Sequence, residues 1–159
     1  MSNPAHLWLT DENGSPIVGS CLMPARLGSI ELRFVNHHVW LPTDPNTGKL
    51  TGTRLHTPLK MQKEFDRTTP LLFRALCEGR ILKTATLKMY QTNDAGIEME
   101  YFNIVMENVK ITAITPNLHP SGITSTHLED IELRYEKILW KYIDGNILYE
   151  DSWNHRVFA

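Results

Sequence analysis

Two adjacent histidines, His37 and His38, are the most evident candidates for metal chemistry in this sequence. Successive residues of a β-strand point to opposite faces of the sheet, so both imidazoles are not expected to bind one ion. No His-x-His or Cys-x-x-Cys pattern accompanies them. We therefore interpret them as two strand histidines, one of which can face a subunit contact, and the sequence predicts no metal site.

A run of carboxylates and cations in the last third of the chain comprises Glu129, Asp130, Glu132, Arg134, Glu136 and Lys137. On a strand, Glu132, Arg134 and Glu136 share one face, where they can pair along the strand or across it. This pattern is typical of a solvated or interfacial face, and it does not indicate a general acid–base pair.

No nucleophile or phosphate-binding motif completes a catalytic site. Ser20, Ser29 and Ser121 lie near glycines but lack the Gly-x-Ser-x-Gly elbow. Residues 47–51 (Thr-Gly-Lys-Leu-Thr) imitate part of a phosphate loop, yet the earlier glycine, the preceding strand and the following helix are missing. The residues therefore predict no catalytic group, no cofactor and no enzyme.

The composition is that of one ordinary globular domain. The chain has 159 residues, of which 42% are hydrophobic and 21% charged, and its formal net charge is −2. This balance predicts a single domain over residues 1–159 that can bury a core of its own. The two cysteines, Cys21 and Cys77, lie in different elements without metal-type spacing, and we expect both to be buried, reduced thiols.

Charge and hydropathy argue against several partners. The 16 basic and 18 acidic residues form no block of like charge, so no nucleic acid partner is expected. No apolar run has the length of a membrane span, so no membrane insertion is expected. Residues 1–11 have neither the basic nor the apolar stretch of a signal peptide. This predicts folding in the cytoplasm and, if the protein leaves the cell, export by a signal-peptide-independent route.

Residues 41–60 form the segment around which the rest of the chain is organised. Its three prolines fix φ and remove backbone donors, which excludes a helix or a regular central strand. Its two Thr-Gly pairs permit turns. We predict a long, polar, extended hairpin arm between two hydrophobic flanks. Long loops of this kind are functional or disordered, and the regular residue choices here favour function. The alternative is a rigid surface loop with no partner.

The rest of the sequence alternates between strand-like runs and turns. Strands are expected at 6–10, 16–22, 29–41, 59–65, 81–91, 97–106 and 107–115, from 127 onward, and at 147–153. One helix is expected near 69–79, where Thr69 can cap, Pro70 suits the first turn and Gly79 can end the helix.

The order of these elements predicts the fold class. Short turns between strands favour antiparallel pairing. The apolar phase slips between Tyr135 and Ile138, which predicts a β-bulge near 136–137 or a strand that changes sheets. Residues 116–125 are rich in turn formers and are expected to be a loop. We predict a mainly β fold: an antiparallel β-barrel or two packed sheets, with one short α-helix and the long extended arm.

Four segments resemble the Hcp family, the haemolysin-coregulated proteins of bacterial type VI secretion. They are PTDPNTGKLTGTRLHTPL (42–59), PLLFRALCEGRILKTATLKMY (70–90), GIEMEYFNIVMENVKI (96–111) and HLEDIELRYEKILWKYIDGNILYEDSW (127–153). The resemblance covers nearly the whole chain, and four ordered segments are specific where one Thr-Gly pair is not. It implies a β-barrel of two sheets with a flanking helix, in agreement with the residues.

The resemblance implies a structural function. Six copies are expected to close head-to-tail into a ring, and rings to stack into the inner tube that a contracting sheath expels with its effectors. The implied partners are other copies of this chain and the sheath, spike and effector proteins. The expected contacts between rings or neighbouring subunits are Thr43, Asp44, Thr47, Gly48, Lys49, Thr51, Gly52, Arg54 and His56. Arg33 and Asn36 are candidates for effector contact in the lumen.

A second class of function stays open at this point. A monomeric β-sandwich that binds a small ligand or a carbohydrate would have the same composition and strand pattern. A six-fold species in solution would favour the ring, and a persistent monomer would favour the binding protein. The ring interpretation also implies a protein that is cytoplasmic before firing and is then secreted to the extracellular space or a target cell.

Overall fold

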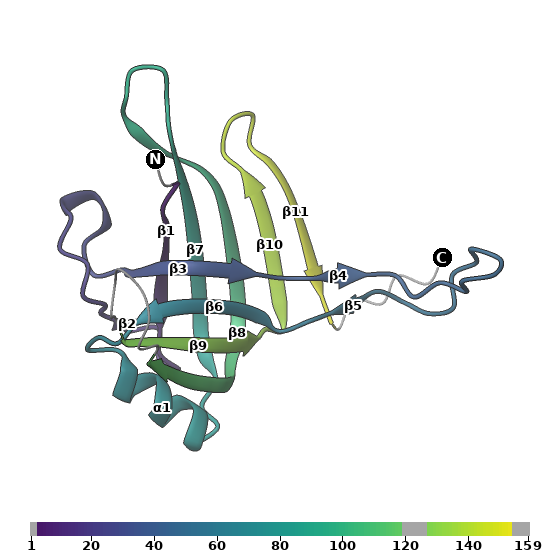
Figure 1. Cartoon of the computed structure of the whole chain (residues 1–159), viewed down its shortest axis with the longest axis horizontal. Helices are drawn as coiled ribbons and strands as arrows, with labels where there is room; N and C mark the ends of the chain where they lie inside the picture. The colour runs from purple at the N-terminus through teal and green to yellow at the C-terminus, as the bar shows by residue number, and fades with distance from the viewer. Residues whose placement is uncertain (1–2, 119–126, 154–159) are drawn as a thin grey trace.

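The computed structural model describes residues 3–118 and 127–153. Figure 1 shows how the elements within these ranges are arranged. They are β1 (Ala5–Thr10), β2 (Pro16–Ile17), the 3-10 helix η1 (Pro24–Arg26), β3 (Ile30–Asn36), β4 (Val39–Trp40), β5 (Leu55–His56), β6 (Leu59–Glu64), α1 (Thr69–Cys77), β7 (Leu82–Thr92), β8 (Glu98–Leu118), β9 (His127–Arg134), β10 (Lys137–Tyr142) and β11 (Ile147–Ser152). Neither of the helices described here is long and apolar enough to cross a membrane.

Six strands close into a barrel in the order β8, β7, β1, β3, β6 and β9, and β9 returns to pair with β8. All of these pairings are antiparallel. In Figure 1, β3, β6 and β9 run across β1, β7 and β8, as the two sides of a small barrel do. The predicted mainly β, antiparallel barrel with one α-helix is confirmed. β10 and β11 extend the sheet beyond β8, and among the described strands β11 pairs with β10 alone.

The long strand β8 makes the closure of the barrel possible. Its first part pairs with β7 on one side and β10 on the other, and its last part pairs with β9. Asn108 lies at the change of partner with a φ of 53°, a left-handed value that asparagine tolerates better than most residues. The prediction of two strands at 97–106 and 107–115 is therefore wrong, because Asn108 bends one strand instead of ending it.

The predicted phase slip is confirmed where β9 ends and β10 begins. Ile131, Leu133 and Tyr135 are buried before this point, and Ile138 is buried after it. β9 lies between β8 and β6, whereas β10 lies between β8 and β11. The two consecutive strands thus share β8 and differ in their other neighbour. Of the loop expected at 116–125, residues 116–118 belong to β8, and residues 119–125 lie outside the described ranges.

The predicted strand over 29–41 is interrupted. His37 and His38 lie in the gap between β3 and β4, so the interpretation of two histidines within a strand is wrong. The His37 ring lies edge-on to Tyr135 with 5.7 Å between centroids. His38 instead stacks on Trp40 at 4.9 Å. The two imidazoles therefore have different aromatic neighbours.

Alternating apolar residues fill the barrel. Leu59 and Met61 of β6 lie in register with Leu133 and Ile131 of β9, and all four are almost completely buried. The residues between them carry polar side chains to the other face, which is the period of a half-buried strand. Truncation of such a side chain to alanine typically costs about 2–5 kcal/mol.

The helix α1 packs against β8 at one end of the barrel. Pro70 lies in its first turn and Gly79 follows it with a φ of 64°, as predicted. The predicted cap is wrong by one residue: Thr68 is the N-cap and Thr69 is helical. Asp66 Oδ1 accepts a hydrogen bond from the Thr68 amide at 2.9 Å, which closes a local turn just before the helix.

A buried ion cluster lies beneath the start of α1. Lys63 of β6 is fully buried and pairs with Glu129 of β9 and, at 2.9 Å, with Asp66. Thr69 Oγ1 donates to Glu129 Oε1 at 3.0 Å. Burial raises the pKa of Asp66, but hydrogen bonds from Thr68 and Lys63 lower it further than burial raises it. Glu129 is therefore buried, whereas the predicted solvated or interfacial face concerned Glu132, Arg134 and Glu136, which are partly or fully exposed.

The expectation of two buried thiols is also wrong. Cys77 is exposed and Cys21 is partly exposed, and both are free. Cys77 lies five residues after Leu72, the buried residue on the inner face of α1, and at 3.6 residues per turn this places it well away from that face. The prediction was wrong because it inferred burial from the apolar character of cysteine alone.

Candidate functional site: the arm and its base

Residues 37–58 leave the barrel between β3 and β6 as an extended ribbon, which we call the arm (Figure 1). Within it, β4 and β5 are joined by two residue pairs. A single bridge between Thr43 and Leu50 joins the two sides further out. Isolated two-stranded ribbons are marginally stable in water, so this ribbon depends on its turn chemistry and on contacts with the body.

Local hydrogen bonds hold the tip of the arm in one conformation. The Asp44 amide donates to Lys49 O and the Gly48 amide donates to Asp44 O, each at 2.8 Å. The Asp44 carboxylate accepts from the Asn46 amide at 2.8 Å, and Thr47 Oγ1 accepts from the Lys49 amide at 3.3 Å. Gly48 adopts a φ of 73°, which glycine reaches without strain. The tip is thus preorganised although most of it is exposed.

The structure divides the predicted contact residues of the arm into two groups. Those at the tip are Thr43, Asp44, Thr47, Gly48, Lys49, Thr51 and Gly52, all exposed except the half-buried Asp44. Arg54 and His56 lie at the base of the arm, against the end of β11. The two groups are therefore available for different roles.

An ion pair fixes the base of the arm to β11. Arg54 Nε donates to Asp151 Oδ2 at 2.5 Å, and Arg54 Nη2 donates to Ser152 O at 2.9 Å. The hydrogen bond to Asp151 raises the pKa of the Arg54 guanidinium. Burial raises the pKa of the Asp151 carboxyl, but hydrogen bonds from Arg54 and His56 outweigh it and lower that pKa. Asp151 is therefore held as a carboxylate between two donors.

A chain of four polar side chains continues inward from this ion pair. His56 Nε2 lies 2.8 Å from Asp151 Oδ2, and His56 Nδ1 lies 2.5 Å from the Tyr135 hydroxyl. The same hydroxyl lies 2.8 Å from His37 Nε2. We call Asp151, His56, Tyr135 and His37 the base chain. Three of its members were absent from the predicted contact residues, and only His56 was among them.

Aromatic rings and burial enclose the base chain. The His56 ring lies 5.0 Å from the Trp153 ring and 6.3 Å from the Trp140 ring. Burial raises the pKa of Tyr135 far above its usual value. Burial, and then the charge of His56, lower the pKa of His37. Tyr135 is thus a neutral hydroxyl that can donate one hydrogen, and it is not a nucleophile.

Exposed apolar side chains gather on β11 and along the arm. Ile147 and Tyr149 are each 67% exposed, on both sides of Leu148, which is also exposed. On the arm, the exposed apolar residues are Val39, Trp40, Leu41, Leu50 and Leu55. An edge strand with apolar residues on both faces is a surface that soluble proteins usually cover.

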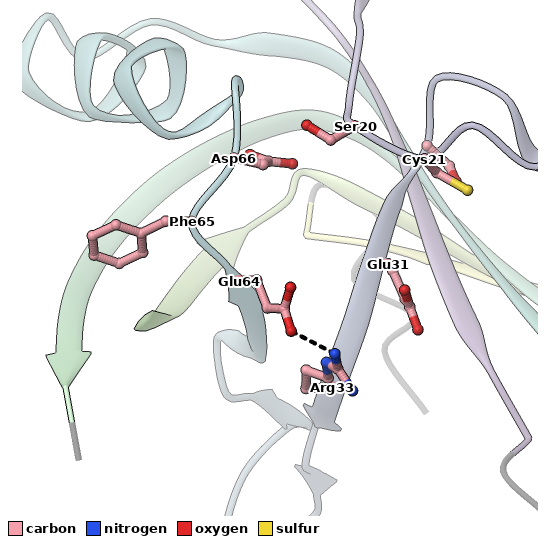
Figure 2. A pocket seen from close by; sticks show the side chains of 8 residues that line it. Ser20, Cys21, Glu31, Arg33, Glu64, Phe65 and Asp66 are labelled. Carbon is pink, nitrogen blue, oxygen red and sulfur yellow. Dashed lines mark hydrogen bonds and ion pairs between the residues drawn. The ribbon is translucent and has the colours of Figure 1, made fainter. Parts of the chain in front are cut away.

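The two predicted lumen residues lie on β3 and are both exposed. Arg33 Nη2 donates to Glu64 Oε1 at 2.5 Å, the contact drawn as a dashed line in Figure 2. This pair borders a cavity of about 230 Å³ that Glu31 and Asp66 also line. Asn36 lies at the end of β3 and does not line the cavity. The structure therefore places Arg33, and not Asn36, at this cavity.

Comparison with known proteins gives consistent matches. The model of the family described as "Type VI secretion system effector, Hcp" matches residues 6–142. The chain is 31% identical over 170 residues to a Pseudomonas aeruginosa protein named "Major exported protein", and the match covers 99% of each.

Solved structures agree with this match along nearly the whole chain. The Hcp1 protein from the E. coli EAEC 042 pathovar, solved as a double mutant, is 49% identical with a TM-score of 0.89, covering 96% of this chain and 99% of that one. The secreted protein Hcp3 from Pseudomonas aeruginosa is 26% identical with a TM-score of 0.81, covering 97% and 100%. The comparisons give no support to a monomeric ligand- or carbohydrate-binding protein. The chain belongs to the Hcp family and is a structural, exported tube protein of type VI secretion, not an enzyme.

Proposed function

We propose that six copies of this chain close head-to-tail into a ring and that the rings stack into the inner tube of the type VI machine. The observation that supports this most strongly is that one subunit carries two different contact surfaces, the exposed apolar edge strand β11 and the preorganised polar arm. A head-to-tail contact uses two different surfaces on each subunit and closes into a ring when its rotation divides a full turn.

Within a ring, β11 and the face around it contact the neighbouring subunit. Ile147 and Tyr149 are exposed in the single chain, and a neighbour that covers them removes apolar surface from water at about 25 cal/mol per Å². None of the described strands pairs with the outer edge of β11, so this edge can also accept a further strand. Both properties are typical of a surface that a neighbouring subunit covers.

Between rings, the tip of the arm makes the contact. Thr43, Thr47, Lys49 and Thr51 present hydroxyl and ammonium groups to the outside, and the turn around Gly48 is already hydrogen-bonded. A preorganised tip loses little conformational freedom on binding, which favours association. Arg54 and His56 support this contact indirectly, because their hydrogen bonds to Asp151 hold the base of the arm in place.

Effectors bind in the lumen of the ring, where Arg33 and Asn36 of β3 are candidate contacts. Both side chains are exposed, and Arg33 is one of the residues that line the cavity in Figure 2. The sheath surrounds the stacked rings and the spike caps them. The protein is cytoplasmic before firing and then leaves the cell without a signal peptide.

Native mass spectrometry and negative-stain microscopy of the purified chain test this proposal. We expect a six-fold species and annular particles that stack at high concentration. A variant shortened between Asn46 and Thr53 should keep the six-fold species and lose stacking. The matched control shortens the β7–β8 hairpin tip around Asp94, which carries no predicted contact. Solitary, folded monomers at every concentration would overturn the proposal.

A further inference from the structure

The base chain joins four separate parts of the molecule. His56 comes from β5, Asp151 from β11, Tyr135 from the link between β9 and β10, and His37 from the link between β3 and β4. In Figure 1 the end of β11 lies beside β4 and β5, where the arm leaves the barrel. The base chain therefore connects both sides of the arm to the β10–β11 hairpin.

The contact with Asp151 fixes one proton in the base chain. A carboxylate only accepts hydrogen bonds, so His56 Nε2, 2.8 Å from Asp151 Oδ2, carries a hydrogen. The other nitrogen, His56 Nδ1, is bare when the imidazole is neutral and protonated when it is an imidazolium. Asp151 stabilises either form, and Arg54 shares its negative charge.

The Tyr135 hydroxyl then limits the charge that the base chain can hold. The hydroxyl has one hydrogen and lies between two ring nitrogens, His56 Nδ1 at 2.5 Å and His37 Nε2 at 2.8 Å. Its hydrogen satisfies one of these contacts, and the facing histidine must supply the hydrogen of the other. If both histidines are imidazoliums, two N–H groups face the oxygen and the hydroxyl hydrogen has no acceptor between them.

The surrounding charges do not stabilise a second imidazolium in the base chain. Asp151 is already shared with Arg54, and Arg134 is a further cation whose charge acts on Tyr135. His38 and His56 both disfavour the charged form of His37, whereas a backbone hydrogen bond with Thr57 favours it. The 6.2 Å between the rings of His37 and His56 adds direct repulsion when both are charged.

We propose that the base chain is an acid-sensitive latch, which holds the arm against the β10–β11 hairpin with at most one imidazolium and opens when both histidines are protonated. The arm depends on these contacts, because β4 and β5 share only two residue pairs of their own. If the arm joins stacked rings, a consequence that rests on the proposed function, acidification separates the rings.

The direction of the pH effect follows from His37. Burial and the neighbouring His56 lower the pKa of His37, so the latched state binds fewer protons than the open state. The latch is therefore closed above the ordinary histidine pKa of about 6.5 and is lost as the pH falls through the lowered value. Histidine is the side chain suited to a change in this range.

Pulsed electron spin resonance distances between the arm and the hairpin test the latch. Spin labels at Lys49→Cys and Asp144→Cys, with Cys21 and Cys77 replaced by serine, report the arm relative to the β10–β11 hairpin. Dilution with unlabelled chain makes every distance intrachain whether or not rings form, so the latch and the proposed assembly can fail separately. Between about pH 8 and pH 5 we expect one narrow distance to become a broad distribution, with the midpoint below about 6.5.

Three variants make the result specific. His37→Gln keeps a neutral donor and removes the titrating group, so its distance should stay narrow at acidic pH. Tyr135→Phe keeps the ring and removes the hydroxyl, so its distance should be broad at every pH. His38→Gln is the control and should keep the acid transition, with a midpoint equal to or slightly above the parent's, because His38 also disfavours the charged form of His37. A distance that stays narrow at acidic pH in the parent, or an unchanged transition in His37→Gln with circular dichroism intact, would overturn the latch.

Discussion

Asn108 Nδ2 donates to Glu136 Oε2 at 2.7 Å, and this contact joins the bend of β8 to the break between β9 and β10. Asn108 has a φ of 53°, and Glu136 lies in the two-residue gap between strands. The Glu136 amide also donates to Glu107 O at 3.0 Å. Two hydrogen bonds, one from a side chain and one from the backbone, thus join Glu136 to β8 at the point where β8 changes its partner strand.

Asn108→Ala is expected to destabilise the fold. Alanine in the left-handed conformation costs about 1–2 kcal/mol, and the hydrogen bond to Glu136 is lost as well. Asn108→Gly is the matched variant, because glycine accepts this φ and loses only the amide contact. In urea unfolding, the free energy of unfolding of Asn108→Gly should lie between those of Asn108→Ala and the parent. Equal stability of the alanine and glycine variants would show that backbone strain is not the cause.

Lys63→Met is expected to destabilise the fold strongly. Lys63 is fully buried and is the only described cation paired with the buried Glu129, whose Oε2 has no hydrogen-bond partner among the described residues. Removal of one partner of a buried ion pair costs about 3–5 kcal/mol, because the other charge is left uncompensated.

The double variant Lys63→Met with Glu129→Leu should recover much of this loss, since it leaves no isolated charge beneath α1 apart from the partly exposed Asp66. Lys60→Met is the control: Lys60 lies on the exposed face of the same strand and pairs with Glu132 at 3.6 Å. Its effect on the urea midpoint should be small. If Lys63→Met were no less stable than Lys60→Met, the assigned role of Lys63 would be wrong.

Local chemistry made the arm and the helix predictable from the sequence. Pro70 and Gly79 mark the helix because each restricts or frees the φ of its own residue. The prolines and glycines of the arm act in the same way. The strand boundary expected between residues 106 and 107 was wrong, because β8 continues through the left-handed φ of Asn108.

The base chain could not be predicted because its contacts are distant in sequence. Tyr135 and His37 are 98 residues apart, and His56 and Asp151 are 95 residues apart. Periodicity indicates which face a residue occupies, but it does not indicate which other strand faces it. Lys63 and Glu129 were missed because only their charge was considered: Lys63 shares the buried face of β6 with Leu59 and Met61, and Glu129 shares the buried face of β9 with Ile131 and Leu133.

Gly19→Ala is expected to destabilise the turn that precedes β3. An added Cβ would lie 2.3 Å from Ser29 O, and this oxygen is backbone that cannot move aside cheaply. Because Gly19 also donates to Gly28 O at 2.8 Å, the approach is part of the loop's own structure. We expect a loss of about 2 kcal/mol or more in urea unfolding. Gly52→Ala on the arm, whose Cβ meets Pro42 only at ordinary contact distance, should change stability little.

Asp151→Asn is expected to lower stability at neutral pH and to flatten its acid dependence. The folded pKa of Asp151 is lowered, so its carboxylate contributes stability above the ordinary aspartate value of about 3.9. This contribution is lost as the pH falls through the lowered value. Urea midpoints measured from neutral pH to about pH 3 should converge for the parent and the variant at the acidic end. Asp144→Asn, at an exposed turn, should run parallel to the parent.

Ile147→Lys is expected to weaken ring formation without unfolding the subunit. Ile147 is 67% exposed on β11, so lysine at this position removes few contacts within the chain but places a charge on the proposed subunit interface. Native mass spectrometry should show fewer six-fold species, and the urea midpoint of the dissociated subunit should stay close to the parent. Ile97→Lys is matched, because Ile97 is 59% exposed on the β7–β8 hairpin, away from β11. Equal loss of rings in both variants would place the interface elsewhere than β11.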